Sequence, residues 1–183
     1  MGLPKIKKNP WRTLGSKRVY QNQWIKVRED QVITPDGQKG IYGMIEIKPS
    51  AGIIALAEKK EIYLVGQWRY THRKYSWEIP TGGAKPNEKL LATAKRELLE
   101  ETGLIAKKWI SLGTIDNSNG YTNDVVYLFL ARKLKKTKPK FEPTEKLKII
   151  KIPFQKAVQL VMENQITDSI SVAGILKAKE CLQ

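Results

Sequence analysis

The most constraining feature of this 183-residue chain is a group of three glutamates that follows a pair of glycines. Gly82 and Gly83 come first, and Glu97, Glu100 and Glu101 follow. In an α-helix, residues spaced i, i+3 and i+4 lie on one face, so these three carboxylates would project together. Like charges at this spacing destabilise a helix by about 0.2–0.5 kcal/mol per pair, and a helix that needed only solubility would interleave lysines. The pattern therefore predicts a helix whose acidic face has a ligand.

The chemistry of that face indicates a divalent cation. Clustered carboxylate oxygens suit hard ions, and Mg²⁺ is the one most used on phosphates, with Mn²⁺ as a substitute. Arg96 directly precedes the first glutamate and offers a guanidinium fork that can orient a neighbouring carboxylate. The two glycines leave the backbone free to approach a metal or a phosphate, because they have no Cβ.

The first half of the chain reads mainly as β-structure. Residues 22–33 and 41–48 are rich in β-formers and flank Thr34-Pro35-Asp36-Gly37, a turn sequence, so residues 22–48 are predicted to form a hairpin. A second hairpin is predicted from strands 53–57 and 62–68, and a short strand over 75–79.

Helices are expected in three places. One begins after Asn87, the expected N-cap, and stops at Gly103, and Glu88 suits the positive end of its dipole. Strands follow near 107–115, 124–131 and 146–152, and two helices near 154–163 and 169–181 end the chain, with Pro153 in the first turn of one and Asp168 capping the other. The expected fold class is α+β with a mixed sheet. We expect residues 1–48 to form an N-terminal extension and hairpin lobe, and residues 49–183 to form a catalytic domain.

Net charge is the strongest compositional signal, at +15. Positive residues gather at Lys5–Arg18 and at Arg132–Lys140. Nucleic acid, an anionic membrane surface and a small polyanionic substrate are all compatible with this charge, as is a purely solvated basic surface. No zinc-finger spacing and no RNA-binding aromatic motif accompanies the charge, so nucleic acid is not favoured.

The same composition bears on location. No apolar run approaches the roughly 18 residues that a membrane span needs, and the N-terminal segment does not have the pattern of a secretory signal. Cys181 is the single cysteine and has no internal partner for a disulfide. We therefore expect a cytoplasmic protein that does not engage a membrane.

The segment from Gly82 to Leu104 resembles the Nudix box. All nine positions that define the box are filled, and the set comprises Gly82, Glu88, Arg96, Glu97, Leu98, Glu100, Glu101, Gly103 and Leu104. The resemblance implies an α/β/α sandwich and a metal-dependent attack of water on a diphosphate. It implies Glu97 and Glu101 as primary Mg²⁺ ligands, Glu100 as a further ligand or orienter, and Arg96 as an orienter. The carbonyl of Thr81 would complete the metal shell.

Over about residues 11–181 the chain looks like the ADP-ribose and nucleoside diphosphate sugar branch of that family. Gln67-Trp68-Arg69 matches a branch motif whose arginine contacts the substrate phosphate or terminal ribose, and residues 77–82 resemble the lead-in to the box. Trp24 and Tyr42 match positions where the branch holds the base between aromatic rings. The branch further implies a homodimer that exchanges its N-terminal lobes, with a nucleotide sugar as substrate.

Other features of the resemblance leave alternatives open. Counting eight residues back from Pro153 places the expected catalytic base at Glu145, with Glu142 as its competitor. A proline that ADP-ribose hydrolases usually carry past the box is absent, so the resemblance does not select ADP-ribose among sugar nucleotides. The alternatives are hydrolysis of dinucleoside polyphosphates or RNA 5′ ends, and a binding module without turnover. His72 lies in a basic loop and is read as a surface residue.

Overall fold

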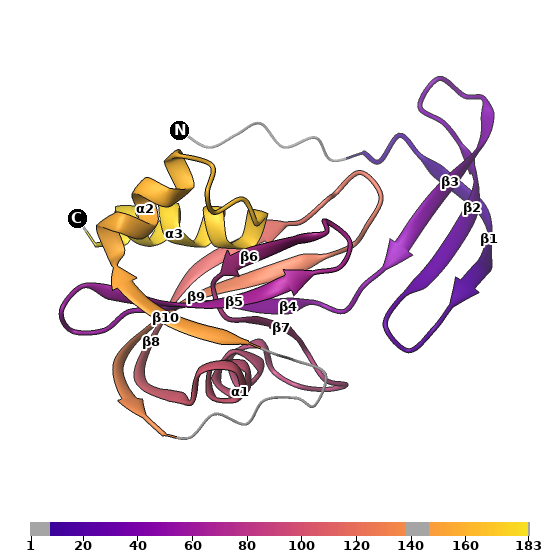
Figure 1. Cartoon of the computed structure of the whole chain (residues 1–183). Helices are drawn as coiled ribbons and strands as arrows, with labels where there is room; N and C mark the ends of the chain where they lie inside the picture. The colour runs from indigo at the N-terminus through magenta and orange to yellow at the C-terminus, as the bar shows by residue number, and fades with distance from the viewer. Residues whose placement is uncertain (1–7, 138–146, 183) are drawn as a thin grey trace. The chain divides into compact units, whose positions relative to one another are not determined.

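The computed structural model describes residues 8–137 and 147–182. The chain divides into two compact units. Unit 1 contains residues 1–47 and 118–124, and unit 2 contains residues 48–117 and 125–183. Because each unit has its own internal contacts, we describe them separately. Figure 1 gives the element labels used below.

Unit 1 is a three-stranded antiparallel sheet in the order β1-β2-β3. Its strands are β1 (Arg12–Gln21), β2 (Lys26–Ile33) and β3 (Lys39–Glu46). The predicted hairpin is confirmed as β2 and β3, which pair in register from Lys26↔Glu46 to Ile33↔Lys39. The prediction was incomplete, because a third strand, β1, pairs antiparallel with β2. All ten residues of β1 are exposed, so this strand has no alternation of apolar and polar side chains from which it could be predicted.

Two sets of interactions hold unit 1 together. Arg28 binds Asp30 and Glu46, with nitrogen–oxygen distances of 2.8 Å to each. The segment 118–124 joins the sheet through β3, because the Ile45 amide donates to the Tyr121 carbonyl at 2.8 Å and the Tyr42 hydroxyl donates to the Gly120 carbonyl at 2.5 Å. Residues far apart in the sequence therefore meet on one small sheet.

Unit 2 contains two further sheets. One has the order β10-β5-β6 and the other has the order β7-β4-β9-β8. The second is a mixed sheet, because β4 pairs parallel with β9 and antiparallel with β7. The strands are β4 (Ser50–Ala55), β5 (Glu61–Arg69), β6 (Lys74–Glu78), β7 (Thr81–Gly83), β8 (Leu104–Asp116), β9 (Val125–Lys136) and β10 (Lys148–Pro153).

Three helices cover these sheets, namely α1 (Leu90–Thr102), α2 (Phe154–Met162) and α3 (Ser169–Cys181). In Figure 1, α1 lies on one side of the strands of unit 2, and α2 and α3 lie on the other. The core is divided accordingly. A larger apolar cluster includes Leu128, Leu130 and Ile175 on the α3 side, and a smaller one includes Ala94, Leu98 and Phe129 on the α1 side. This layering confirms the expected α/β/α sandwich.

The ends of the helices test the predicted caps. Gly103 ends α1 with φ of 67°, in the left-handed region that glycine favours, and Asp168 caps α3 by accepting from the Ser171 amide at 2.8 Å. The predicted N-cap of α1 is wrong. The helix starts at Leu90 with Lys89 in the cap position, and Asn87 has a φ of 61° in the preceding turn. Within the described residues, none of the helices has the length and apolar content needed to span a bilayer.

Candidate active site

The loop from β7 into α1 forms one polar cavity of about 230 Å³. The cavity is lined by Thr81, Gly82, Gly83, Lys85, Arg96, Glu97, Glu100 and Glu101. The structure thus brings together every residue of the glutamate segment for which the sequence predicted a metal-related role. The reason is geometric, since Ala94 and Leu98 are fully buried under the sheet and so fix how α1 is turned, with the glutamates beside β7.

Gly82 lies close against the side chain of Glu97 on α1. A Cβ at this position would overlap the carboxylate of Glu97. A side chain here would therefore displace one of the candidate metal ligands. The φ of Gly82 does not fall in the left-handed region, so the requirement for glycine is one of space rather than of backbone conformation.

Arg96 organises the acidic face. Its guanidinium donates to Glu97 at 2.5 Å, to Glu100 at 2.9 Å and to the Gly83 carbonyl at 3.0 Å. The remaining nitrogens bind Glu88, with Nε and Nη2 at 2.9 Å from its two carboxylate oxygens. These acidic partners raise the pKa of Arg96 further above its ordinary value, Glu88 contributing most. The arginine is therefore a permanently charged brace between the loop and the helix.

Glu88 is the functional residue whose role the sequence analysis missed. It was expected only to favour the helix dipole, but its carboxylate also accepts from the Lys85 amide at 2.9 Å and the Thr93 hydroxyl at 3.0 Å. The hydrogen bond from Arg96 is the largest cause that lowers the pKa of Glu88 from 4.5 to about 2. The box spacing itself was the available signal, because it places a glutamate eight residues before the arginine.

The donor set of this cavity fits a divalent metal ion. Glu97, Glu100 and Glu101 supply carboxylate oxygens, and the Thr81 amide donates to Glu101 at 3.2 Å, which fixes that side chain beside the loop. Glu101 is only 5% exposed, and carboxylates are rarely so buried unless they are paired or hydrogen-bonded. Within residues 8–137 and 147–182, no three acidic, His or Cys side chains already converge as a metal cage. Glu97 and Glu100 instead form ion pairs with Arg96.

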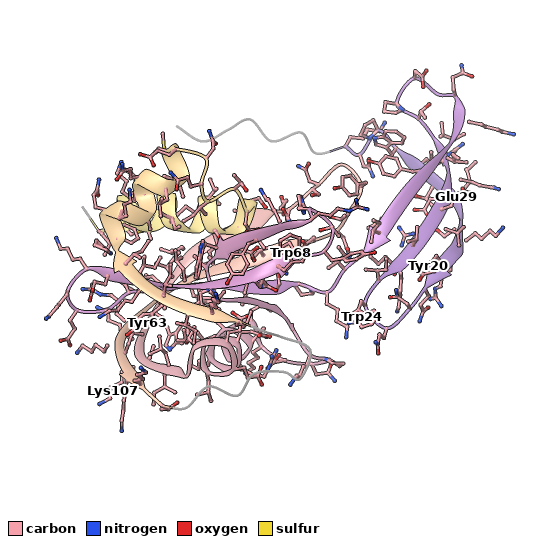
Figure 2. The ribbon with its side chains drawn as sticks, in the orientation of Figure 1. Tyr20, Trp24, Glu29, Tyr63, Trp68 and Lys107 are labelled. Atoms are coloured by element: carbon pink, nitrogen blue, oxygen red, sulfur yellow. The ribbon has the colours of Figure 1, made fainter. Side chains whose placement is uncertain are left out.

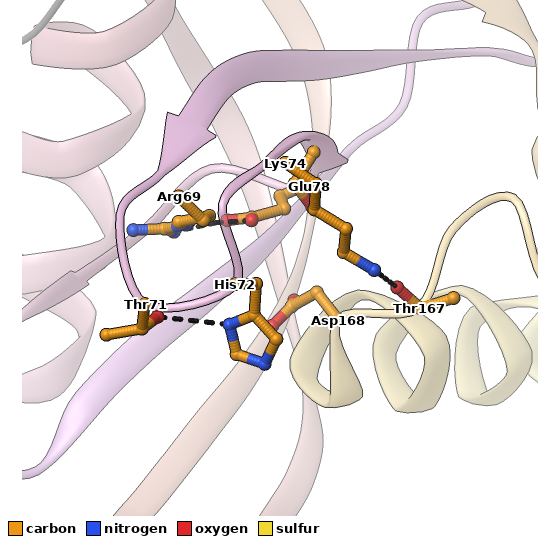
Figure 3. A pocket seen from close by; sticks show the side chains of 8 residues that line it. Arg69, Thr71, His72, Lys74, Glu78, Thr167 and Asp168 are labelled. Atoms are coloured by element: carbon orange, nitrogen blue, oxygen red, sulfur yellow. Dashed lines mark hydrogen bonds and ion pairs between the residues drawn. The ribbon is translucent and has the colours of Figure 1, made fainter.

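Arg69 lies in a second polar cavity, of about 250 Å³, at the tip of the β5–β6 hairpin (Figure 3). It forms a two-point salt bridge with Glu78, which is 4% exposed. The hydrogen bond to Glu78 is the main cause that raises the pKa of Arg69, and the charges of Asp168 and Glu101 add to it. Arg69 is therefore electrostatically coupled to the glutamate cavity, although it is not among the residues that line it.

The remaining predicted residues are placed as follows. Trp24 is 75% exposed, and its side chain extends into solvent from the β1–β2 turn of unit 1 (Figure 2). Tyr42 is 36% exposed and packs edge-to-face on Trp11, with ring centroids 5.3 Å apart. His72 is exposed and lines the Arg69 cavity. Glu145 and Glu142 lie outside the described residues.

Two family models cover most of the chain. A NUDIX domain matches residues 46–169, and the chain therefore belongs to the Nudix hydrolase family. Its N-terminal part is more specific, because residues 11–45 match the nucleoside diphosphate sugar hydrolase N-terminal domain.

Individual relatives agree with this assignment. An ADP-ribose pyrophosphatase of Mycobacterium tuberculosis is 30% identical over 171 residues, which cover 90% of this chain and 81% of that protein. A methanol dehydrogenase activator of Bacillus methanolicus is 27% identical over 94% of this chain and 95% of its own length. Among solved structures, an ADP compounds hydrolase superposes with a TM-score of 0.86 and 17% identity, covering 97% of each chain, which supports the fold.

Proposed function

We propose that this Nudix hydrolase cleaves the pyrophosphate bond of a nucleoside diphosphate sugar, ADP-ribose or a similar sugar nucleotide, and releases a nucleoside monophosphate and a sugar phosphate. The observation that carries the proposal is that Glu97, Glu100 and Glu101 line one cavity beside Gly82, in a chain whose N-terminal segment matches the nucleoside diphosphate sugar hydrolase N-terminal domain. Relatives whose names specify ADP-ribose support this class of substrate.

Glu97, Glu100 and Glu101, with the carbonyl of Thr81, would hold the metal ion, which we propose to be Mg²⁺ with Mn²⁺ as a substitute. A bound divalent ion neutralises phosphate charge and lowers the pKa of a water molecule. Arg96 keeps Glu97 and Glu100 oriented through its direct contacts with both. Arg69, held by Glu78, is a cation of fixed direction that we assign to the substrate phosphate or terminal sugar.

We assign Trp24 and Tyr42 of unit 1 to the nucleoside base. Stacking on an aromatic ring contributes about 1–3 kcal/mol per base without selecting it. The exposed face of Trp24 makes its ring available for such a contact. Trp24→Ala is therefore expected to raise KM about tenfold or more with little change in kcat, and an unchanged KM would remove the assignment.

A homodimer built through the N-terminal lobe, residues 1–48, is part of the proposal, with residues 49–183 as the catalytic domain. The edge strand β1 and its flanks expose the apolar residues Trp11, Leu14, Val19 and Tyr20, which a partner could cover. Light scattering on the purified chain should give twice the monomer mass. A cytoplasmic location, consistent with one exposed free cysteine, Cys181, completes the proposal and is tested by cell fractionation.

Glu145 is retained as the proposed catalytic base, with Glu142 as its competitor. A base must reach the attacking water, and a carboxylate on a loop can do so when the loop closes over the site. Comparison of Glu145→Gln with Glu142→Gln separates the two. The true base should lower kcat by about 10²–10⁴-fold, while the other variant retains activity.

A substrate panel with Glu101→Gln as the inactive control tests the function directly. ADP-ribose, GDP-mannose, UDP-glucose, diadenosine polyphosphates and 5′-triphosphate RNA are each incubated with the enzyme and Mg²⁺, and the phosphate-containing products are identified. A sugar nucleotide should be cleaved fastest, and Glu101→Gln should lose turnover while it keeps the wild-type circular dichroism spectrum. Preference for a dinucleoside polyphosphate or for RNA would replace the proposed substrate, and full activity of Glu101→Gln would refute the metal assignment.

A further inference from the structure

A basic strip on the β8–β9 pair is not used by the proposed hydrolysis. It consists of the six exposed cations Lys107, Lys108, Arg132, Lys133, Lys135 and Lys136, here called the basic ladder. Between residues 104 and 115, and along the whole of β9, the two strands contain no acidic residue. Figure 2 shows Lys107 extending from this end of the sheet into solvent. The ladder is thus a local concentration of one sign of charge.

The pairing of the two strands makes this arrangement unfavourable for the folded protein alone. Lys108 lies directly opposite Arg132 in the antiparallel register, and Lys135 and Lys136 follow on the same strand opposite Ile105 and Leu104. Side chains directly opposite each other have Cβ atoms about 4.5–5.5 Å apart, and like charges at that distance repel. Within the described residues, the ion pairs of the protein involve Arg28, Arg69, Arg96 and Lys151, and none involves the ladder.

The position of the ladder separates it from the candidate active site. In the sheet order β7-β4-β9-β8, the strand β7 that carries Thr81 and Gly82 lies at one edge and β8 lies at the other. Trp109 and Leu134 of these strands pack into the smaller apolar cluster, so β8 and β9 are anchored to the core, and all six cations are exposed. The ladder therefore lies on packed strands and not on a frayed end.

The basic ladder offers four cations on one strand. Arg132, Lys133, Lys135 and Lys136 fall within five residues, which extend over about 13 Å at about 3.3 Å per residue. Because successive side chains of a strand point to opposite faces, about four phosphates can reach these cations only on a flexible single strand and not on a rigid duplex. A membrane surface fits less well, because interfacial binding needs large apolar side chains among the cations, and Ile105 at 41% exposure is the one large apolar side chain on this end of β8 and β9 that is exposed.

We propose that the basic ladder binds the phosphate backbone of single-stranded nucleic acid without sequence preference. Binding of this kind is driven by release of counterions, so its dependence on salt reports the number of phosphates contacted. For about four contacts on a single strand, a plot of log Kobs against log salt should have a slope of about −3. Affinity should then fall about sixtyfold between 50 and 200 mM salt.

The test uses the full-length enzyme and fluorescently labelled 12-nucleotide RNA and DNA of mixed sequence, with binding followed by anisotropy. The ladder variant replaces Lys108, Arg132 and Lys135 by Gln, and the matched control replaces Lys59, Lys156 and Lys177, three exposed lysines elsewhere in unit 2, by Gln. Both variants lose three positive charges. The ladder variant should change the slope from about −3 to about −1, because each lost contact removes about 0.7, whereas the control should keep the wild-type slope.

Three results would overturn the proposal. The first is equal slopes for the two variants, which would assign binding to net charge. The second is binding to vesicles that contain phosphatidylserine with none to either oligonucleotide. The third is a ladder variant with unchanged RNA binding but a lower kcat/KM for a sugar nucleotide at low salt, which would make the ladder a device for attracting substrate. The proposal does not rest on the hydrolytic activity, which both variants should retain at 150 mM salt.

Discussion

Substitution of Glu88 by Gln tests whether the Glu88–Arg96 interaction both stabilises the fold and prepares the metal site. The change keeps the size of the side chain and removes its charge. Arg96 then loses its principal partner, while its contacts with Glu97 and Glu100 remain. Two measurable quantities should respond, namely the free energy of unfolding and the affinity for Mg²⁺.

The stability effect has a definite size and pH range. Lowering the pKa of Glu88 from 4.5 to about 2 corresponds to at most about 3.4 kcal/mol. Since the side chain retains 16% of its exposure and Arg96 keeps other partners, we expect a smaller loss of about 1.5–3 kcal/mol, the usual range for hydrogen bonds to charged groups. A carboxyl group whose pKa is lower in the folded state stabilises the fold while it is ionised. This contribution is complete above about pH 4.5 and is lost as pH falls toward 2.

Urea unfolding of the wild type and of Glu88→Gln at several pH values measures the difference between the two proteins. It should be constant from pH 7 to about pH 5 and should shrink toward zero below that. Glu180→Gln, an exposed substitution on α3, controls for the loss of one negative charge and should change stability little. A wild-type advantage that is the same at pH 3 as at pH 7 would refute the role of the Glu88 charge.

The metal effect follows from competition. Without the charge of Glu88, Glu97 and Glu100 are the remaining acidic partners of Arg96, beside the Gly83 carbonyl, so a metal ion must compete with a guanidinium that binds these two carboxylates more strongly. The Mg²⁺ concentration for half-maximal turnover should rise about 10–100-fold, the range found when groups that orient metal ligands are removed. An unchanged Mg²⁺ requirement would show that Arg96 does not compete for these carboxylates.

Three further predictions concern the cavity, the hairpin and the ladder. Gly82→Ala should lower kcat at least tenfold at limiting Mg²⁺, because its Cβ would displace the Glu97 carboxylate, and activity as a function of Mg²⁺ checks this. Arg69→Lys should raise KM for the sugar nucleotide about tenfold, because one ammonium cannot replace the two-point contact with Glu78. Steady-state kinetics at saturating Mg²⁺ measures this, and an unchanged KM would contradict the prediction. Lys108→Thr should raise the free energy of unfolding at low salt by about 0.2–1 kcal/mol through relief of cross-strand repulsion, and a loss of stability in urea titrations would contradict that reading.

The amino-acid sequence alone determined the class of the protein and the glutamates that line the cavity between β7 and α1. Three glutamates at helical spacing after two glycines are a local pattern, and helix geometry converts that spacing directly into a shared face. For the same reason Gly103 and Asp168 were predicted as helix ends, and both end or begin a helix as expected. The local rules were correct for these two helix ends but not for the start of α1, where Lys89 and not Asn87 occupies the cap position.

Only the tertiary structure decided what depends on contacts between distant segments. In the folded protein Glu88 accepts hydrogen bonds from Arg96, a contact that its position near the start of α1 did not predict. Arg69 pairs with Glu78, and residues 118–124 belong to the same unit as the N-terminal sheet. The strand β1 was not predicted, because a fully exposed strand has no apolar periodicity and forms through backbone pairing with β2. The pairing of β8 with β9 likewise brought Lys107 and Lys108 beside the cations of Arg132–Lys136 to form the basic ladder. Their separation in the sequence carries no information about this proximity.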